Sequence, residues 1–158
     1  QEYGFNAILM SAGAVSFPGD NFNPRIYHVI PALIKKFIEA KESKEKEVVV
    51  WGTGKPTREF LYVEDAAKGI ILAVEKYNKE DPVNLGAGFE ISIKDLAELI
   101  KKFTRFEGKI VWDTSKPDGQ PRRMLDVTKA KKEFGFSAKT KFEEGLKETI
   151  KWYLQNKK

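Results

Sequence analysis

Short apolar runs alternate with amphipathic helical stretches along this chain, and that alternation restricts its fold more than any other feature. Val48–Trp51 is a β-branched run closed by a turn rich in Gly and Pro, which is typical of a strand. Between Ile30 and Ile38, apolar residues recur every three or four positions, which predicts a helix with Pro31 in its first turn. Strands that alternate with helices predict an α/β fold.

The same patterns assign the remaining segments. Further strands are expected at residues 5–10 (a buried strand), 58–63, 83–85 and 109–112. Further helices are expected from Glu64, after Ser92, over residues 128–134 and from Thr140 to about Leu154. Capping boxes are predicted at Ser92/Asp95 and at Thr140/Glu143. The helix from Glu64 is expected to bury Ala66, Ile70, Leu72 and Val74.

Composition limits the class of protein. The chain has 158 residues, 41% of them hydrophobic, which is enough for a buried core, and we expect one domain spanning residues 1–158. The net charge of +5 comes from intermixed acidic and basic residues, which argues against nucleic-acid binding and favours small anionic ligands such as phosphates. No apolar run reaches the roughly 18 residues of a membrane span, so we expect no membrane contact and a cytoplasmic location.

Several kinds of site are excluded by missing residues. The chain has no Cys, so it has no disulfide, thiolate metal site or cysteine nucleophile, and the lone His28 cannot form a His-rich metal site. Gly86-Ala87-Gly88 is too short for the Gly-rich turn that binds a dinucleotide, and we interpret it as a tight turn. Residues 52–56 do not match a phosphate-binding loop, because Pro56 stands where Ser or Thr would bind magnesium.

Three stretches together resemble a known family. Within residues 51–65, the pattern Arg-x-Phe-x-x-Val-x-Asp is similar to the signature of extended short-chain dehydrogenases/reductases. Residues 18–22 read Pro-Gly-Asp-Asn-Phe, residues 28–33 read His-Val-Ile-Pro-Ala-Leu, and residues 115–123 contain Lys-Pro-Asp-Gly. This combination resembles the GDP-L-fucose synthase (GDP-4-keto-6-deoxymannose epimerase/reductase) family over essentially the whole chain.

The resemblance implies a fold and a function. The chain would be the C-terminal, substrate-binding portion of an extended short-chain dehydrogenase, with the last strands and helices of a Rossmann-like sheet. The family epimerises a GDP-sugar and then reduces it with NADP as cofactor. We therefore expect a GDP-sugar-binding fragment that lacks the N-terminal dinucleotide-binding half.

The resemblance also implies site residues, and their chemistry fits a sugar diphosphate. Ligand roles fall to Lys36, Trp51, Arg58, Asp118 and Arg123. An Arg presents a rigid fork to phosphate oxygens, a Trp at a strand end can lie against a base or sugar, and Asp118 can accept from a base or ribose. His28 is implied as the catalytic acid that protonates a sugar carbon, a role suited to an imidazole near neutral pH.

The chain also departs from the family. The resemblance implies that the family's Ser, Tyr-x-x-x-Lys pair and Cys belong to its N-terminal half, and neither Tyr27 nor Tyr62 has a Lys four positions on. Residues 12–17 are mostly small and apolar where the family has Asn and Tyr beside the nicotinamide. We therefore expect no bound cofactor and no hydride transfer by this chain. Arg105 replaces a helix-ending Gly, which costs up to about 1 kcal/mol if it is left-handed.

Two alternatives stay open. The chain could instead be a fragment of a UDP- or dTDP-sugar epimerase or dehydratase, which competition between GDP and UDP would separate. It could also be an engineered or excised non-catalytic domain. An excised half exposes apolar faces, so we expect self-association.

Overall fold

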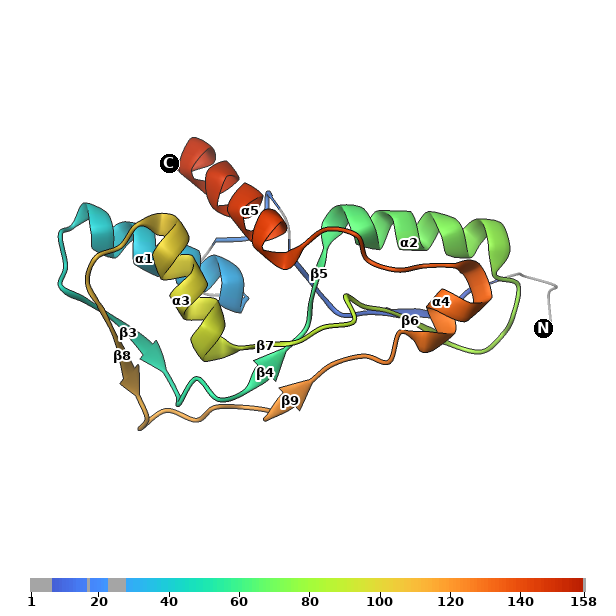
Figure 1. Ribbon diagram of the computed structural model, residues 1–158, viewed down its shortest axis with the longest axis horizontal. Helices are drawn as coiled ribbons and strands as arrows, with labels where there is room; N and C mark the ends of the chain where they lie inside the picture. The colour runs from blue at the N-terminus through green and yellow to red at the C-terminus, as the bar shows by residue number, and fades with distance from the viewer. Residues whose placement is uncertain (1–6, 17, 23–27, 158) are drawn as a thin grey trace. The chain divides into compact units, whose positions relative to one another are not determined.

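The computed structural model describes residues 7–16, 18–22 and 28–157. Its helices (Figure 1) are α1 (Val29–Glu42), α2 (Val63–Lys76), α3 (Ile93–Thr104), α4 (Thr128–Phe134) and α5 (Phe142–Asn156). Its strands are β1 (Met10–Ala12), β2 (Ala14–Ser16), β3 (Glu47–Trp51), β4 (Thr57–Arg58), β5 (Phe60–Tyr62), β6 (Val83–Leu85), β7 (Ile91–Ser92), β8 (Lys109–Asp113) and β9 (Arg122–Arg123). Strands and helices alternate, which confirms the α/β prediction.

The described chain divides into two compact units, each built from three separate segments. Unit 1 contains residues 1–15, 59–90 and 124–140, and unit 2 contains residues 16–58, 91–123 and 141–158. The expectation of one domain stays a prediction, which limited proteolysis would test.

Unit 1 is organised around pairs of short strands. β1 pairs with β6 in parallel, with Met10 opposite Val83, and β2 pairs with β5. The core of the unit is formed by buried residues of β5, α2, β6 and α4 and the segments that flank them: Leu61, Ala66, Ala73, Tyr77, Val83, Leu85, Ala130, Phe134 and Phe136. Residues 7–9 belong to no strand and β1 is at most half-buried, so the prediction of a buried strand over residues 5–10 is wrong for its described part.

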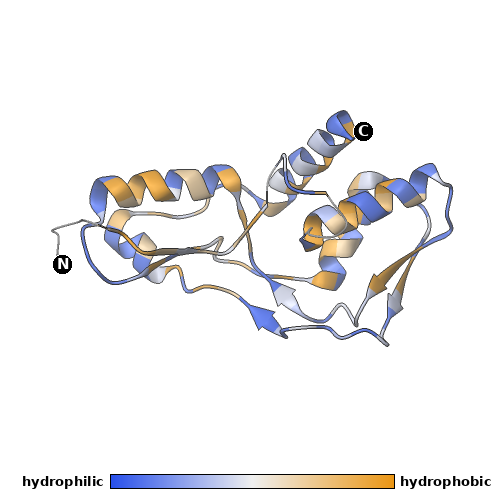
Figure 2. Cartoon of the chain, turned by 180° about the vertical axis from the view of Figure 1, so that it is seen from behind, coloured by the Kyte–Doolittle hydropathy of each residue, from blue (hydrophilic) through white to orange (hydrophobic). Residues whose placement is uncertain are grey.

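The predicted buried face of α2 is right at Ala66 and in part at Leu72, which is half-buried against the core of unit 1, and wrong at Ile70 and Val74. The buried residues of the helix are Asp65, Ala66, Gly69 and Ala73, whereas Ile70 is 46% exposed and Val74 is 69% exposed. The helix packs closely through small residues, because a Cβ on Gly69 would lie only 2.8 Å from the Phe136 ring. Apolar residues along α2 are visible in Figure 2. Self-association stays a prediction, which light scattering would test.

The last helix begins differently from the prediction. Its N-cap is Lys141, with no side-chain capping bond, so the capping box at Thr140 is wrong. The amides of Lys139 and Thr140 instead donate to Oδ2 of the buried Asp65, at 3.0 and 2.8 Å. Because Asp65 holds the backbone ahead of the helix, Thr140 is fixed outside it.

Unit 2 contains a parallel ladder, β3 with β8, in which Val48 faces Ile110 and Val50 faces Trp112. Helix α1 packs against α3 and β3, and α3 packs against α5. The expected Ser92 cap is confirmed, since its side chain accepts from the Asp95 amide at 3.0 Å. Arg105 ends α3 in the left-handed conformation, with φ 55°. This confirms the prediction that Arg105 stands at the helix-ending position where the family has a Gly.

The expected strand at residues 58–63 is two strands. β4 ends at Arg58 and β5 begins at Phe60, with Glu59 between them and α2 already starting at Val63. β4 is the central strand of a three-stranded sheet, antiparallel to β7 and parallel to β9. This small sheet belongs to unit 2 and carries part of the candidate site.

Candidate functional site

The five predicted ligand-binding residues all belong to unit 2, on elements far apart in sequence. Lys36 lies on α1, Trp51 ends β3, Arg58 ends β4, and Arg123 ends β9. Asp118 lies in the segment between β8 and β9. Residues 52–56 and 114–121 connect these strands and run side by side, since the Gly52 amide donates to the Asp113 carbonyl and the Thr57 amide donates to the Pro121 carbonyl, both at 2.9 Å.

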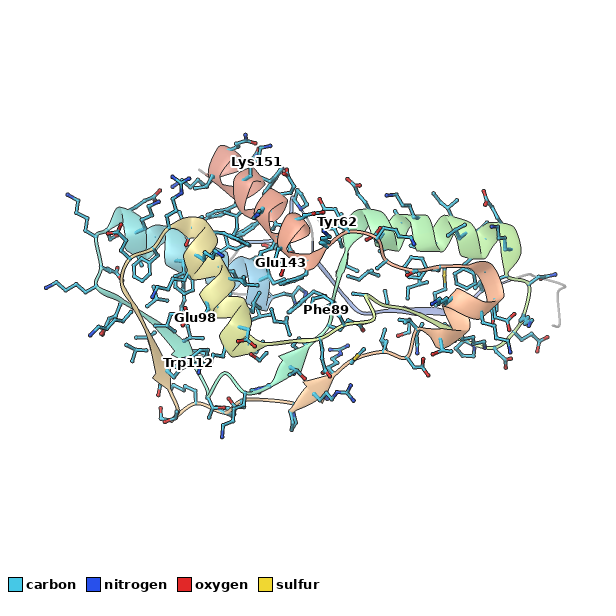
Figure 3. The ribbon with its side chains drawn as sticks, viewed as in Figure 1. Tyr62, Phe89, Glu98, Trp112, Glu143 and Lys151 are labelled. Carbon is cyan, nitrogen blue, oxygen red and sulfur yellow. The ribbon has the colours of Figure 1, made fainter. Side chains whose placement is uncertain are left out.

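Trp51 points away from the core because of strand alternation. Val48 and Val50 are buried, so Val49 and Trp51 face the other side of the ladder, where Trp51 is 66% exposed. Trp112, the register partner of Val50, is half-buried on β8 (Figure 3). The strand therefore presents the indole of Trp51 to solvent at its carboxyl end.

Two lysines lie over the Trp51 ring. The Lys36 ammonium is 5.9 Å from the ring centroid and donates to the Val49 carbonyl at 2.9 Å. The Lys116 ammonium is 5.8 Å from the same centroid. Both distances are within reach of a cation–π interaction. Sequence reasoning did not assign Lys116, although it belongs to the quoted Lys-Pro-Asp-Gly stretch; that motif was the signal available.

Arg58 and Arg123 are brought together by strand register. They are Cα partners in the parallel β4–β9 pair, so their side chains leave the same face of the sheet. Arg58 is half-buried and its Nη1 donates to the Thr57 carbonyl at 2.7 Å, whereas Arg123 is exposed. A Cβ on Gly119 would lie 3.8 Å from Arg58 Nη2, so the backbone of the connecting segment passes close to this guanidinium. Two rigid forks on one face suit phosphate oxygens.

Asp118 is held by Thr53. The Thr53 amide donates to Oδ1 at 2.5 Å, and the Thr53 hydroxyl donates to Oδ2 at 2.7 Å. These backbone and side-chain hydrogen bonds from Thr53, with a weaker contribution from the Lys55 charge, lower the pKa of Asp118 below its ordinary value of 3.8. Asp118 is therefore an anion at neutral pH, and each carboxylate oxygen already has a donor within the protein.

A turn after β8 places Lys116. Asp113 Oδ1 accepts from the Ser115 amide at 3.1 Å and from its hydroxyl at 2.5 Å, and the Lys116 amide donates to the Asp113 carbonyl at 3.2 Å. The hydrogen bond from the Ser115 side chain is the main cause that lowers the pKa of Asp113. This turn sends the chain back beside Trp51, which is the register partner of Asp113.

His28 is the exposed N-cap residue of α1, and its carbonyl accepts from the Ala32 amide at 3.0 Å. Among residues 7–16, 18–22 and 28–157, no hydrogen bond or ring contact joins its imidazole to the other predicted site residues. The preceding residues 23–27, including Tyr27, lie outside the described residues. The catalytic role of His28 stays a prediction.

Unit 1 has a glycine turn after β6, and a carboxylate already fills it. Glu59 is 3% exposed, and its Oε1 accepts from the Gly88 amide at 2.9 Å. A Cβ on Gly86 would lie 2.5 Å from the same oxygen. An amide that already binds a buried carboxylate is not available to a phosphate, so this turn does not fit the diphosphate of NADP.

Two further properties follow from the described part of the chain. No group of three or more His, Asp or Glu side chains there is arranged to hold a metal ion. None of the helices that the structure describes is long and apolar enough to cross a membrane.

Comparisons with known proteins show what the chain is similar to. The family model "NAD dependent epimerase/dehydratase family" matches residues 1–86. The probable GDP-L-fucose synthase 1 of Oryza sativa subsp. japonica is 50% identical over 98% of this chain and 47% of its own length. The chain therefore spans about half the length of the curated relatives it matches. The resemblance to GDP-L-fucose synthases is confirmed.

Solved structures give the same fold. A GDP-L-fucose synthetase from Naegleria fowleri bound to NADP superposes with a TM-score of 0.84 and 37% identity, over 92% of this chain and 46% of the other. A UDP-glucose 4-epimerase from Thermotoga maritima, solved with UDP-glucose, has a TM-score of 0.85 and 27% identity, over 98% of this chain and 48% of the other. The predicted relation to extended short-chain dehydrogenases is confirmed.

Proposed function

Because the chain belongs to the NAD dependent epimerase/dehydratase family, whose model matches residues 1–86 of its 158, we propose that unit 2 binds a GDP-sugar. The observation that carries this proposal is the register pairing of Arg58 with Arg123, which puts two guanidinium groups on one face of a small sheet. Two adjacent forks match the two phosphates of a sugar nucleotide in charge and in geometry.

The other site residues have roles consistent with this ligand. Trp51 offers a flat apolar surface to the base or the sugar, and Lys36 and Lys116 add positive charge beside it. Asp118 belongs to the same site through its neighbours Lys116 and Gly119. His28 is proposed as the acid that protonates a sugar carbon, as the family resemblance implies.

GDP is proposed as the nucleotide because the relative with 50% identity is a probable GDP-L-fucose synthase. The similarity to an epimerase solved with UDP-glucose, at 27% identity, supports UDP as the competing candidate. Arg58, Arg123 and Trp51 would serve either nucleotide, since none of them distinguishes one base from the other by its chemistry.

We propose that this chain binds the ligand without turning it over. The family's cofactor, NADP, is bound by the related Naegleria fowleri enzyme, but the glycine turn of unit 1 does not fit its phosphates. The chain has no Cys, and its one Tyr-x-x-x-Lys spacing joins Tyr153, which is buried in α5, to Lys157, which pairs with Glu42. A measurable rate of NADPH oxidation by the purified chain, with a GDP-4-keto sugar present, would contradict this part of the proposal.

Calorimetric titration of the purified chain with GDP and with UDP tests the binding proposal. GDP should bind more tightly than UDP and change the tryptophan fluorescence. That fluorescence change should be lost in Trp51→Phe and retained in Trp152→Phe, a matched control on α5. Absence of GDP binding would refute the proposal, and tighter binding of UDP would transfer it to a UDP-sugar.

A further inference from the structure

We propose that the paired hydrogen bonds between Thr53 and Asp118, called here the Thr53–Asp118 lock, position the ligand-binding side chains of unit 2. In this view Thr53 is a positioning residue and Asp118 acts through Thr53, not by reading the nucleotide base. The inference rests on the proposed function, because a positioning role requires a ligand.

Each partner of the lock contributes two groups: Thr53 its amide and its hydroxyl, and Asp118 its two carboxylate oxygens. Thr53 donates its amide to one carboxylate oxygen at 2.5 Å and its hydroxyl to the other at 2.7 Å. The Thr53 hydroxyl oxygen also accepts from the Lys55 amide at 3.3 Å, which orients the hydroxyl toward Asp118. Two bonds in parallel fix the plane of a carboxylate, whereas one bond would let it rotate.

Gly52 leaves room for the lock. It is buried with φ 85°, a conformation that favours glycine, and a Cβ at this position would overlap Oδ1 of Asp118. The carboxylate thus occupies the space where any other residue would carry its side chain. The turn after β3 is therefore shaped to receive Asp118, which a base-reading residue would not require.

Asp118 lies at the middle of the segment that the lock would align. Lys116, over the Trp51 ring, is two residues before it, and Gly119, whose backbone lies beside Arg58, is one residue after it. Backbone hydrogen bonds hold this segment only near its ends, at Asp113 and Pro121. Fixing its centre to Thr53 removes conformational freedom that the ligand would otherwise have to remove on binding.

The remaining lone pairs of the carboxylate define the competing explanation. Each oxygen can accept more than one hydrogen bond, so Asp118 would be able to accept from a guanine amino group while still bonded to Thr53. The two roles differ in what happens when Thr53 alone is changed. Positioning predicts that loss of the Thr53 hydroxyl weakens any nucleotide diphosphate, whereas base reading predicts a change in discrimination only at Asp118.

The test is a double-mutant cycle with Thr53→Val, Asp118→Ala and the double variant in the full chain. Dissociation constants are measured for GDP and for inosine diphosphate, which lacks the 2-amino group of guanine. Each single variant should bind both nucleotides about tenfold more weakly, with the GDP-to-inosine diphosphate ratio unchanged. The double variant should bind no more weakly than Asp118→Ala alone, because the two residues act through the same contact.

Matched controls separate positioning from general damage. Thr128→Val and Asp126→Ala make the same two changes in unit 1, where the Thr128 amide donates to Asp126. Both should bind GDP as the unchanged chain does. Thr53→Ser keeps the hydroxyl and should restore binding, which guards against a Thr53→Val protein that simply fails to fold.

Three results would overturn the inference. Unchanged GDP affinity in Thr53→Val would show that Thr53 does not position the ligand-binding side chains. A GDP-to-inosine diphosphate ratio that falls in Asp118→Ala but not in Thr53→Val would make Asp118 a base-reading residue. If the unchanged chain binds no GDP, the proposed function fails and the positioning role fails with it. This outcome can be told apart from failure of the positioning role alone, because it is seen before any residue is substituted.

Discussion

Replacing Arg58 with methionine should weaken GDP binding and leave the fold about as stable as before. Methionine keeps much of the length of the arginine side chain but has no charge and no donor. Arg58 is half-buried beside the register partner Arg123, in the centre of the three-stranded sheet. The combination of a large binding effect and a small stability effect distinguishes a ligand-binding arginine from a structural one.

The expected change in stability follows from two opposing terms. Neighbouring strands lie about 4.8 Å apart, and two unit charges at that distance repel by roughly 1 kcal/mol in water. Against this, Arg58 donates to the Thr57 carbonyl at 2.7 Å, a bond with a net value of about 1 kcal/mol. The two terms nearly cancel, so the free energy of unfolding should change by less than about 1 kcal/mol.

The expected change in affinity is larger because nothing opposes it. A hydrogen bond from an ionised donor to phosphate contributes about 1.5–3 kcal/mol, and its loss corresponds to a roughly 10- to 150-fold rise in the dissociation constant of GDP. The repulsion between Arg58 and Arg123 is also relieved by a bound diphosphate, which adds to the effect of Arg58 in the complex.

Calorimetry with GDP and urea unfolding followed by circular dichroism measure the two quantities. Arg122→Met is the matched control, since Arg122 precedes Arg123 in β9 and successive side chains of a strand point to opposite faces. It removes the same charge from the same strand and should change GDP affinity by less than about twofold. Equal losses of affinity in both variants would show that net charge, not the Arg58–Arg123 pair, drives binding, and the reasoning would fail.

Three further outcomes are expected. Arg105→Gly should raise the free energy of unfolding by up to about 1 kcal/mol, since Arg105 ends α3 with φ 55°; no gain in urea unfolding would contradict this. Gly69→Ala should lower it by about 1–3 kcal/mol, because the added methyl would lie 2.8 Å from the Phe136 ring, and an unchanged urea midpoint would show that the ring can move. Thr53 holds the pKa of Asp118 below 3.8, so the stability that the lock contributes is complete above about pH 4 and is lost as the pH falls through the lowered pKa; a carboxyl NMR titration with its midpoint at or above 3.8 would contradict this.

Periodicity was sufficient to predict the helices of this chain. Apolar spacing located α1, α3 and α4, and the Ser92 cap was readable from the side chain three residues later. The helix-ending position of Arg105 was predicted from the resemblance, because the family has a Gly there. These features depend on residues close in sequence, and local chemistry decides them.

Periodicity was misleading where packing is set by small residues. The α2 pattern correctly favours Ala66, but it also favours Ile70 and Val74, which are exposed, and it misses Gly69 and Ala73, which are buried. Phe136 packs closely against Gly69, so the side of α2 with the smallest side chains faces the core. Hydrophobicity alone does not reveal this, because the shape of the opposing surface comes from a segment more than sixty residues away.

The candidate site was predicted as a set of residues but not as an arrangement. Arg58 and Arg123 were named separately, and only the β4–β9 register shows that they are neighbours. Lys116 was missed although it belongs to the quoted Lys-Pro-Asp-Gly stretch, and Thr53 was missed because a Thr in a turn carries no signal of its own. Both become recognisable once the segment after β8 is seen to run beside the turn after β3.

The signature motif itself consists mostly of structural residues, and this limits what it says about substrate. Glu59, Phe60, Leu61 and Asp65 are all buried, and the carboxylates of Glu59 and Asp65 bind backbone amides of unit 1. Arg58 alone extends from the motif onto the site face of unit 2, and an arginine that binds phosphate serves any nucleotide diphosphate. Under the proposed function, we expect discrimination between GDP and UDP to come from residues outside the motif. Segment 114–121 passes Trp51 and Arg58, so its exchange between relatives should change the preferred base.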